Sequence, residues 1–183
     1  MPGEFEPQDG VILIWPKRPG SWPYEAKEAG KVFAEIANKL AETEKVYMLT
    51  EPETEAVARE LLCENVEILT IPTDDAWARD VGPTFVTDGK EVRGVNWSFN
   101  AWGGTYDGLY QDWQKDDKVA EEFCKLTGYD YYDAAPFVLE GGSIHSDGQG
   151  TVIATEACLL SKGRNPELTK EQIEAKLQEY LGA

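Results

Sequence analysis

The chain has 183 residues, of which 42% are hydrophobic and 11% aromatic, and this composition predicts one packed globular domain of ordinary size. Its net charge of −17 opposes binding to nucleic acid and to anionic membrane surfaces, and would attract small polyamine-like cations. No apolar run approaches the ~18 residues needed to cross a bilayer, and the first residues lack the basic and apolar regions of a secretory signal, so we expect a cytoplasmic protein.

The first part of the chain alternates apolar runs with amphipathic segments. A continuous apolar run followed by Pro16 predicts a buried strand, and apolar residues at helical spacing predict the helix that follows it. The expected elements, in chain order, are a strand over 11–15, a helix over 24–43, a strand over 46–50, a helix over 52–62 and a strand over 66–71. Strands that alternate with helices in this way predict an α/β fold.

Two Asp-Gly turns organise the rest of the chain. Asp88-Gly89 and Asp147-Gly148 each lie between short apolar runs, which is the strongest local signal for an antiparallel hairpin. The last helix should begin at Thr169, because Gln172 three residues later completes a capping-box pattern. The expected elements are strands over 84–87 and 91–97, a helix over 116–127, strands over 136–139, 143–146 and 151–155, and a helix over 169–181.

The stretch 74–83, Asp-Asp-Ala-Trp-Ala-Arg-Asp-Val-Gly-Pro, directly follows a predicted buried strand. Loops at strand ends often carry function, and three carboxylates beside one guanidinium around Trp77 are costly to bury unless they pair or bind a charged ligand. A site for a cation is therefore one interpretation. The other is structural, with Arg79 bridging Asp75 and Asp80 while Trp77 packs in the core.

Residues 97–113 form a long irregular stretch with three Trp, two Tyr and three Gly. Loops of this length inside a compact domain are usually functional or disordered, and the aromatic content argues against disorder. Two interpretations remain open, namely a loop packed on its own side chains and a rim for a substrate pocket.

The cysteines and the histidine give no sign of a metal site. Cys63, Cys124 and Cys158 form no C-x-x-C pair, so we expect reduced, mostly buried thiols on helices, with raised pKa values beside acidic neighbours. His145 is the single histidine, which excludes a multi-histidine site and favours a structural role. We expect neither a metal nor an organic cofactor.

The two hairpin segments also form an internal repeat. Each begins with an acid, Asp80 or Glu140, and continues with glycine, a short strand, an Asp-Gly turn and a second strand, while a weaker third copy starts at Asp9-Gly10. If such units surround an axis, equivalent positions converge on it. Asp80 and Glu140 should then face one pocket that suits a planar cation with several N–H donors, and a guanidinium fits best.

Five long and specific motifs span the chain: Met-Pro-Gly-Glu-Phe-Glu-Pro at 1–7, Asp-Asp-Ala-Trp-Ala-Arg-Asp-Val-Gly-Pro-Thr-Phe at 74–85, Phe-Asn-Ala-Trp-Gly-Gly at 99–104, Phe-Val-Leu-Glu-Gly-Gly-Ser-Ile-His at 137–145 and Asn-Pro-Glu-Leu-Thr-Lys-Glu-Gln-Ile at 165–173. Through them the chain resembles the N-terminal half of agmatine deiminase, in the peptidyl-arginine-deiminase-like branch of the guanidine-modifying pentein superfamily. The resemblance implies an α/β propeller of strand-hairpin-helix units, of which residues 1–183 would be an incomplete single domain with about the first three of five.

The resemblance also implies an activity, the hydrolysis of agmatine to N-carbamoylputrescine and ammonia. In the family a cysteine thiolate attacks the guanidinium carbon with acid–base help from histidine. Asp80 and Glu140 resemble the catalytic carboxylates that bind the guanidinium. Trp77 resembles the aromatic residue along the alkyl stem, and Trp102 is a weaker candidate for the pocket rim.

The family's later Gly-His-x-Asp motif and its Gly-Gly-x-x-x-Cys nucleophile are not found in these 183 residues. We therefore expect the chain alone to be inactive, and its open flanks to self-associate or to bind a complementary C-terminal half. Neither His145 nor any of the three cysteines resembles the missing groups. Two alternatives stay open, a pentein-like binding module without catalysis and an amidinotransferase relative, which the match to the agmatine branch disfavours.

Overall fold

The computed structural model describes all residues from Met1 to Ala183, and they form an α/β fold that divides into two compact units. The small unit is Pro7–Ala78. The large unit is Arg79–Ala183 together with the N-terminal segment Met1–Glu6. The fold class predicted from the alternation of strands and helices is therefore confirmed.

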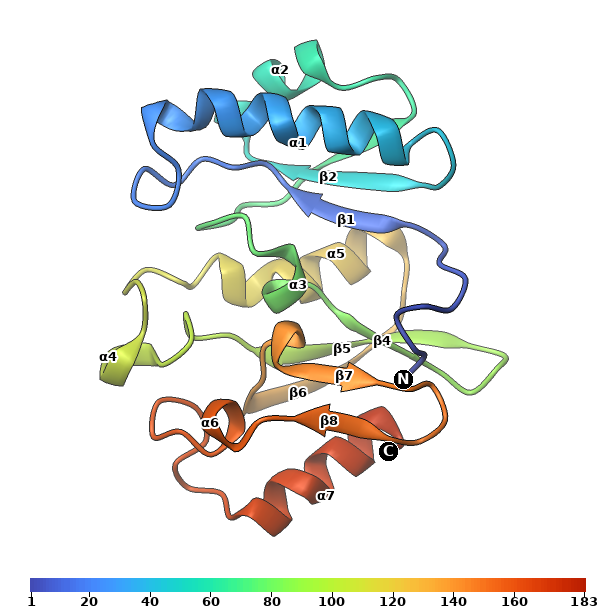
Figure 1. Cartoon of the computed structure of the whole chain (residues 1–183), viewed down its shortest axis with the longest axis vertical. Helices are drawn as coiled ribbons and strands as arrows, with labels where there is room; N and C mark the ends of the chain where they lie inside the picture. The colour runs from blue at the N-terminus through green and yellow to red at the C-terminus, as the bar shows by residue number, and fades with distance from the viewer. The chain divides into compact units, whose positions relative to one another are not determined.

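The small unit is a parallel sheet covered by two helices. Its strands follow one another in the order β1-β2-β3, and the helices that connect them lie on the same face of the sheet (Figure 1). Its elements are β1 Val11–Ile14, α1 Lys27–Leu40, β2 Val46–Thr50, α2 Pro52–Leu61 and β3 Val66–Thr70. The core between sheet and helices consists of Trp15, Ala34, Ala37, Val46, Met48, Ala58 and Val66.

The large unit contains a mixed three-stranded sheet and a separate hairpin. Strand β5 pairs with β4 in the antiparallel sense and with β6 in parallel, and β7 and β8 form the hairpin. The elements are β4 Thr84–Thr87, β5 Val92–Ser98, α5 Val119–Thr127, β6 Tyr131–Val138, β7 Ile144–Ser146, β8 Val152–Ala154 and α7 Lys170–Leu181. The buried core that joins them consists of Val95, Trp97, Ala134, Phe137, Leu139, Ile144, Leu159, Ile173 and Leu181.

Several short helices lie in the segments that connect the longer elements. The four-residue helices are α3 Ala78–Val81, α4 Gly104–Asp107 and α6 Glu156–Leu159, and the 3₁₀ turns are η1 Tyr24–Ala26, η2 Asp116–Lys118 and η3 Gly141–Ser143. None of the four-residue helices was predicted from the sequence, because a single turn is too short to display a helical period.

Both predicted hairpins are confirmed, with Thr87 opposite Val92 across the first turn and Ser146 opposite Val152 across the second. The weaker third copy at Asp9-Gly10 is followed by the expected strand but contains no hairpin. Asp9-Gly10 precedes β1, which pairs with β2 in parallel and so has no tight turn to a partner strand.

Two other expectations need correction. The strand expected over 136–139 is the end of the longer strand β6, whose first residues are largely exposed and so lack an apolar pattern. Among the cysteines, all free, Cys124 is buried on α5, where burial raises its pKa to about 11. Cys158 is half-buried on α6, whereas Cys63 is exposed in the turn after α2, so the prediction of burial on a helix is wrong for Cys63.

Helix α7 begins with the capping box that the sequence predicts. The Gln172 N–H donates to Thr169 Oγ1 at 3.3 Å, and the Thr169 N–H donates to Gln172 Oε1 at 2.8 Å. We expect Thr169→Ala to lower the free energy of unfolding by about 1 kcal/mol, because one N–H of the first turn loses its acceptor. Urea denaturation would measure this loss, with Glu174→Ala on the exposed face of α7 as the control. An unchanged midpoint for Thr169→Ala would contradict the expectation.

None of the helices is both long and apolar enough to span a membrane. No group of three or more His, Cys, Asp or Glu side chains is arranged to hold a metal ion.

Candidate functional site

The candidate site in the large unit is built on the close approach of Asp80 to the turn Glu140-Gly141-Gly142. The Gly142 N–H donates to Asp80 Oδ1 at 3.1 Å. A Cβ atom on Gly142 would lie 2.3 Å from that oxygen, and one on Gly141 would lie 2.3 Å from the Arg79 carbonyl oxygen. Only residues without a Cβ permit this approach, which gives the Glu-Gly-Gly motif a physical reason.

The electrostatic surroundings of Asp80 disfavour its negative charge. Burial raises the pKa of Asp80 above its ordinary value, the hydrogen bond from Gly142 partly offsets this shift, and the charge of Glu140 raises the pKa further. The charge of Arg79, whose guanidinium also pairs with Glu4 at 3.7 Å, makes the smallest contribution and lowers the pKa. A cation bound beside Asp80 would relieve this unfavourable charge.

Glu140 is the most deeply buried acid of the site, with 1% of its surface exposed. One carboxylate oxygen, Oε1, accepts a hydrogen bond from Arg164 Nε at 2.9 Å. The other oxygen, Oε2, is fully buried and has no hydrogen-bond partner. A buried carboxylate oxygen without a donor is costly, and such an exception in a folded protein calls for an explanation, for example a ligand that supplies the donor.

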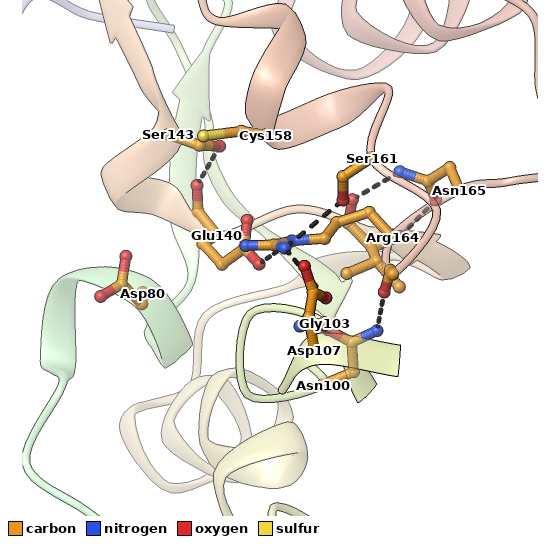
Figure 2. Close-up of polar contacts among 12 residues, drawn as sticks. Asp80, Asn100, Gly103, Asp107, Glu140, Ser143, Cys158, Ser161, Arg164 and Asn165 are labelled. Carbon is orange, nitrogen blue, oxygen red and sulfur yellow. Dashed lines mark hydrogen bonds and ion pairs between the residues drawn. The ribbon is translucent and has the colours of Figure 1, made fainter. Parts of the chain in front are cut away.

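Arg164 is a residue of the site that the sequence analysis missed. Its side chain is only 10% exposed, and its Nη1 lies 3.4 Å from Ser161 Oγ and 4.0 Å from Asp107 Oδ1. Figure 2 draws these side chains around the guanidinium. The sequence contains one indication of its role, which is that Arg164 directly precedes the motif that starts at Asn165. A contact between Arg164 and Glu140 follows no helix or strand period, so periodicity could not predict it.

Trp102 lies in the aromatic loop 97–113, which packs largely on its own side chains. Its ring meets Phe99 at 5.2 Å and Tyr110 at 5.8 Å, both edge to face. This packing supports the self-packed interpretation. Trp102 is still half-buried, so its contribution to a pocket rim stays a prediction.

Trp77 and Asp75 belong to the small unit. Asp75 is fully buried and accepts hydrogen bonds from Trp77 Nε1 at 2.9 Å, from Trp22 Nε1 at 2.8 Å and from the Ser21 hydroxyl. Asp75 therefore stabilises its own loop, and the bridge proposed between Asp75, Arg79 and Asp80 is not needed to explain its burial. The Trp77 ring is 37% exposed, and its role along a substrate stem stays a prediction.

Asp80 offers a test of the site's electrostatics that needs no ligand. We expect Asp80→Asn to raise the free energy of unfolding at pH 7 by about 0.5–1 kcal/mol, because it removes a charge that folding disfavours while an amide oxygen can still accept from Gly142. The half-buried position keeps the effect small.

The sign of the pH dependence follows from the raised pKa of Asp80. Because the folded state binds this proton more tightly than the unfolded state, protonation stabilises the fold as the pH falls through the folded pKa. The advantage of Asp80→Asn over the wild type should therefore shrink as the pH falls from 7 towards 4. Thermal unfolding of both proteins across this range would test it, and an advantage that is negative or independent of pH would contradict it.

Comparisons with known proteins place this geometry in a family. The family model of Porphyromonas-type peptidyl-arginine deiminase matches residues 1–183. A protein of Selenomonas ruminantium named "Putative agmatine deiminase" is 54% identical over 188 residues, which cover 100% of this chain and 51% of the relative. A solved structure of the agmatine deiminase of Enterococcus faecalis has a TM-score of 0.97 and 46% identity to this chain, and the match covers 100% of this chain and 50% of that one.

The chain thus spans about half the length of the curated relatives it matches. The match to the family model nevertheless covers the whole of the present chain, including both hairpins and the Glu-Gly-Gly turn. The chain belongs to the Porphyromonas-type peptidyl-arginine deiminase family.

Proposed function

We propose that the protein is an agmatine deiminase, which hydrolyses the guanidinium of agmatine to N-carbamoylputrescine and ammonia. The observation that carries the proposal is the buried Glu140 Oε2, an anionic acceptor without a donor beside the second carboxylate of Asp80. A guanidinium is planar, permanently charged and rich in N–H donors, so it matches two such acceptors better than an ammonium does.

In this proposal Asp80 and Glu140 bind N–H groups of the substrate guanidinium and hold its carbon for attack. The resemblance implies that a cysteine thiolate forms a covalent adduct, that ammonia leaves and that water releases the product. Cys124 does not suit the nucleophile, because burial raises its pKa to about 11. We place the nucleophile and the histidine base in the half of the relatives that this chain does not span.

The remaining expectations belong to the same proposal. Trp77 would pack along the methylene stem of agmatine, and Trp102 would line the rim of the pocket. The three sheets would act as successive blades of a pentein propeller, completed by a complementary half or by self-association. The three free cysteines suit a reducing, cytoplasmic location.

A chimera tests the proposal. Residues 1–183 would replace the matched half of the Enterococcus faecalis enzyme, and release of ammonia and N-carbamoylputrescine from agmatine would be measured. We expect turnover. A folded chimera that binds agmatine without turnover would support the binding-module alternative, and transfer of the amidino group to an added amine would support the amidinotransferase alternative.

A further inference from the structure

Glu140 is held by one short segment of the chain, the 161–165 turn, which runs from Ser161 to Asn165. The side chain of Asn165 pairs with the backbone of Val138, accepting from its N–H at 2.9 Å and donating to its carbonyl at 2.9 Å. Arg164, the preceding residue, donates from Nε to Glu140 Oε1 at 2.9 Å. The same turn therefore fixes the backbone two residues before Glu140 and also its carboxylate.

The 161–165 turn is itself held by the aromatic loop 97–113. Asn100 Nδ2 donates to the Gly163 carbonyl at 2.7 Å. A Cβ atom on Gly163 would lie 2.7 Å from the Gly103 Cα and 2.4 Å from Asp107 Oδ1, so the two loops touch through their backbones. Figure 2 shows the Arg164 guanidinium between Glu140 and Asp107, with Ser161 also within reach of it. Arg164 is thus oriented before any ligand binds.

We propose that Arg164 is the positioning residue for Glu140, and that it occupies Oε1 so that Oε2 alone is presented to the substrate. The inference rests on the proposed function, in which Glu140 binds a guanidinium. A carboxylate with two free oxygens can rotate about its last torsion, whereas a single directional donor on one oxygen fixes the direction of the other.

Arg164 also sets the charge of the site. Glu140 and Asp80 carry two negative charges when ionised, and the guanidinium of Arg164 cancels one of them. Without Arg164 the negative charges of Glu140 and Asp80 would repel each other more strongly.

The test compares Arg164→Lys and Arg164→Gln in the chimera. We expect Arg164→Gln to lower kcat/KM for agmatine by ~100-fold and Arg164→Lys by ~10-fold, since lysine keeps the charge without the directional fork. Most of the loss should appear in kcat, because the substrate still binds but its carbon is misaligned. Arg93→Gln, an equally conservative change of an arginine paired with Glu91 and Asp130, is the control and should leave both constants unchanged.

The readouts separate failure of this inference from failure of the proposed function. If the unmodified chimera is inactive, the proposed function fails before Arg164 is tested. If that chimera is active, losses confined to KM, or Arg164→Lys as damaged as Arg164→Gln, would overturn the positioning role. Should Arg164→Gln fail to fold, Arg164→Lys carries the test alone. A crystal structure of Arg164→Lys should show a turned Glu140 carboxylate, and an unmoved carboxylate with unchanged kcat/KM would also overturn it.

Discussion

Glu140→Gln is expected to lower kcat/KM for agmatine in the chimera by ~10²–10³-fold. The amide oxygen of glutamine can take the place of Oε1 and accept from Arg164 Nε, which turns the amide NH₂ towards the position of Oε2. A donor would then face the N–H donors of the guanidinium where the wild type offers a charged acceptor. The loss of kcat/KM should therefore have two causes, the missing attraction of the carboxylate for the guanidinium and the repulsion between the amide N–H groups and the guanidinium N–H groups.

The experiment needs a measure of folding beside the kinetics. Thermal unfolding should show that Glu140→Gln remains folded at the assay temperature, and Glu174→Gln on the exposed side of α7 is the matched control for losing one negative charge. A value of kcat/KM within threefold of the unmodified chimera would remove Glu140 from the proposed site. An equal loss in Glu174→Gln would show that net charge, and not the site, is responsible.

The sequence predicts the fold well where local patterns are long. Apolar runs gave β1, β2 and β3, and the Asp-Gly turns gave both hairpins, because each of these signals extends over several residues. Strand β6 was seen only at its end, since its early residues are exposed. The four-residue helices have no period to detect, and the exposure of Cys63 depends on where α2 stops and not on composition.

The candidate site also contains residues that the sequence predicted and one that it did not. Asp80 and Glu140 were predicted from an internal repeat and from motifs, and the structure brings Asp80 to the Glu-Gly-Gly turn. Arg164 was missed because it pairs with Glu140 across 24 residues of chain, where neither composition nor spacing indicates contact. Asp75 belongs to the structural interpretation of the stretch 74–83, since its carboxylate accepts hydrogen bonds from Trp22 and Trp77 within its own unit.

Arg164→Met is expected to lower the free energy of unfolding by about 3–5 kcal/mol. Methionine fills much of the space of the arginine stem but offers no donor, so Glu140 would be left buried with neither oxygen paired. Glu140→Gln should cost less. Its amide can still accept from Arg164, whose guanidinium also lies near Ser161 and Asp107.

The double variant Glu140→Gln/Arg164→Met decides whether the pairing or the packing is responsible. If the cost of Arg164→Met comes from the uncompensated charge of Glu140, neutralising that charge should recover part of it, and the two substitutions should couple by about 1–3 kcal/mol. Urea denaturation at pH 7, followed by tryptophan fluorescence, would give the four free energies needed for the cycle. Additive losses would mean that Arg164 acts through the packing of the 161–165 turn alone, and that its charge does not stabilise Glu140.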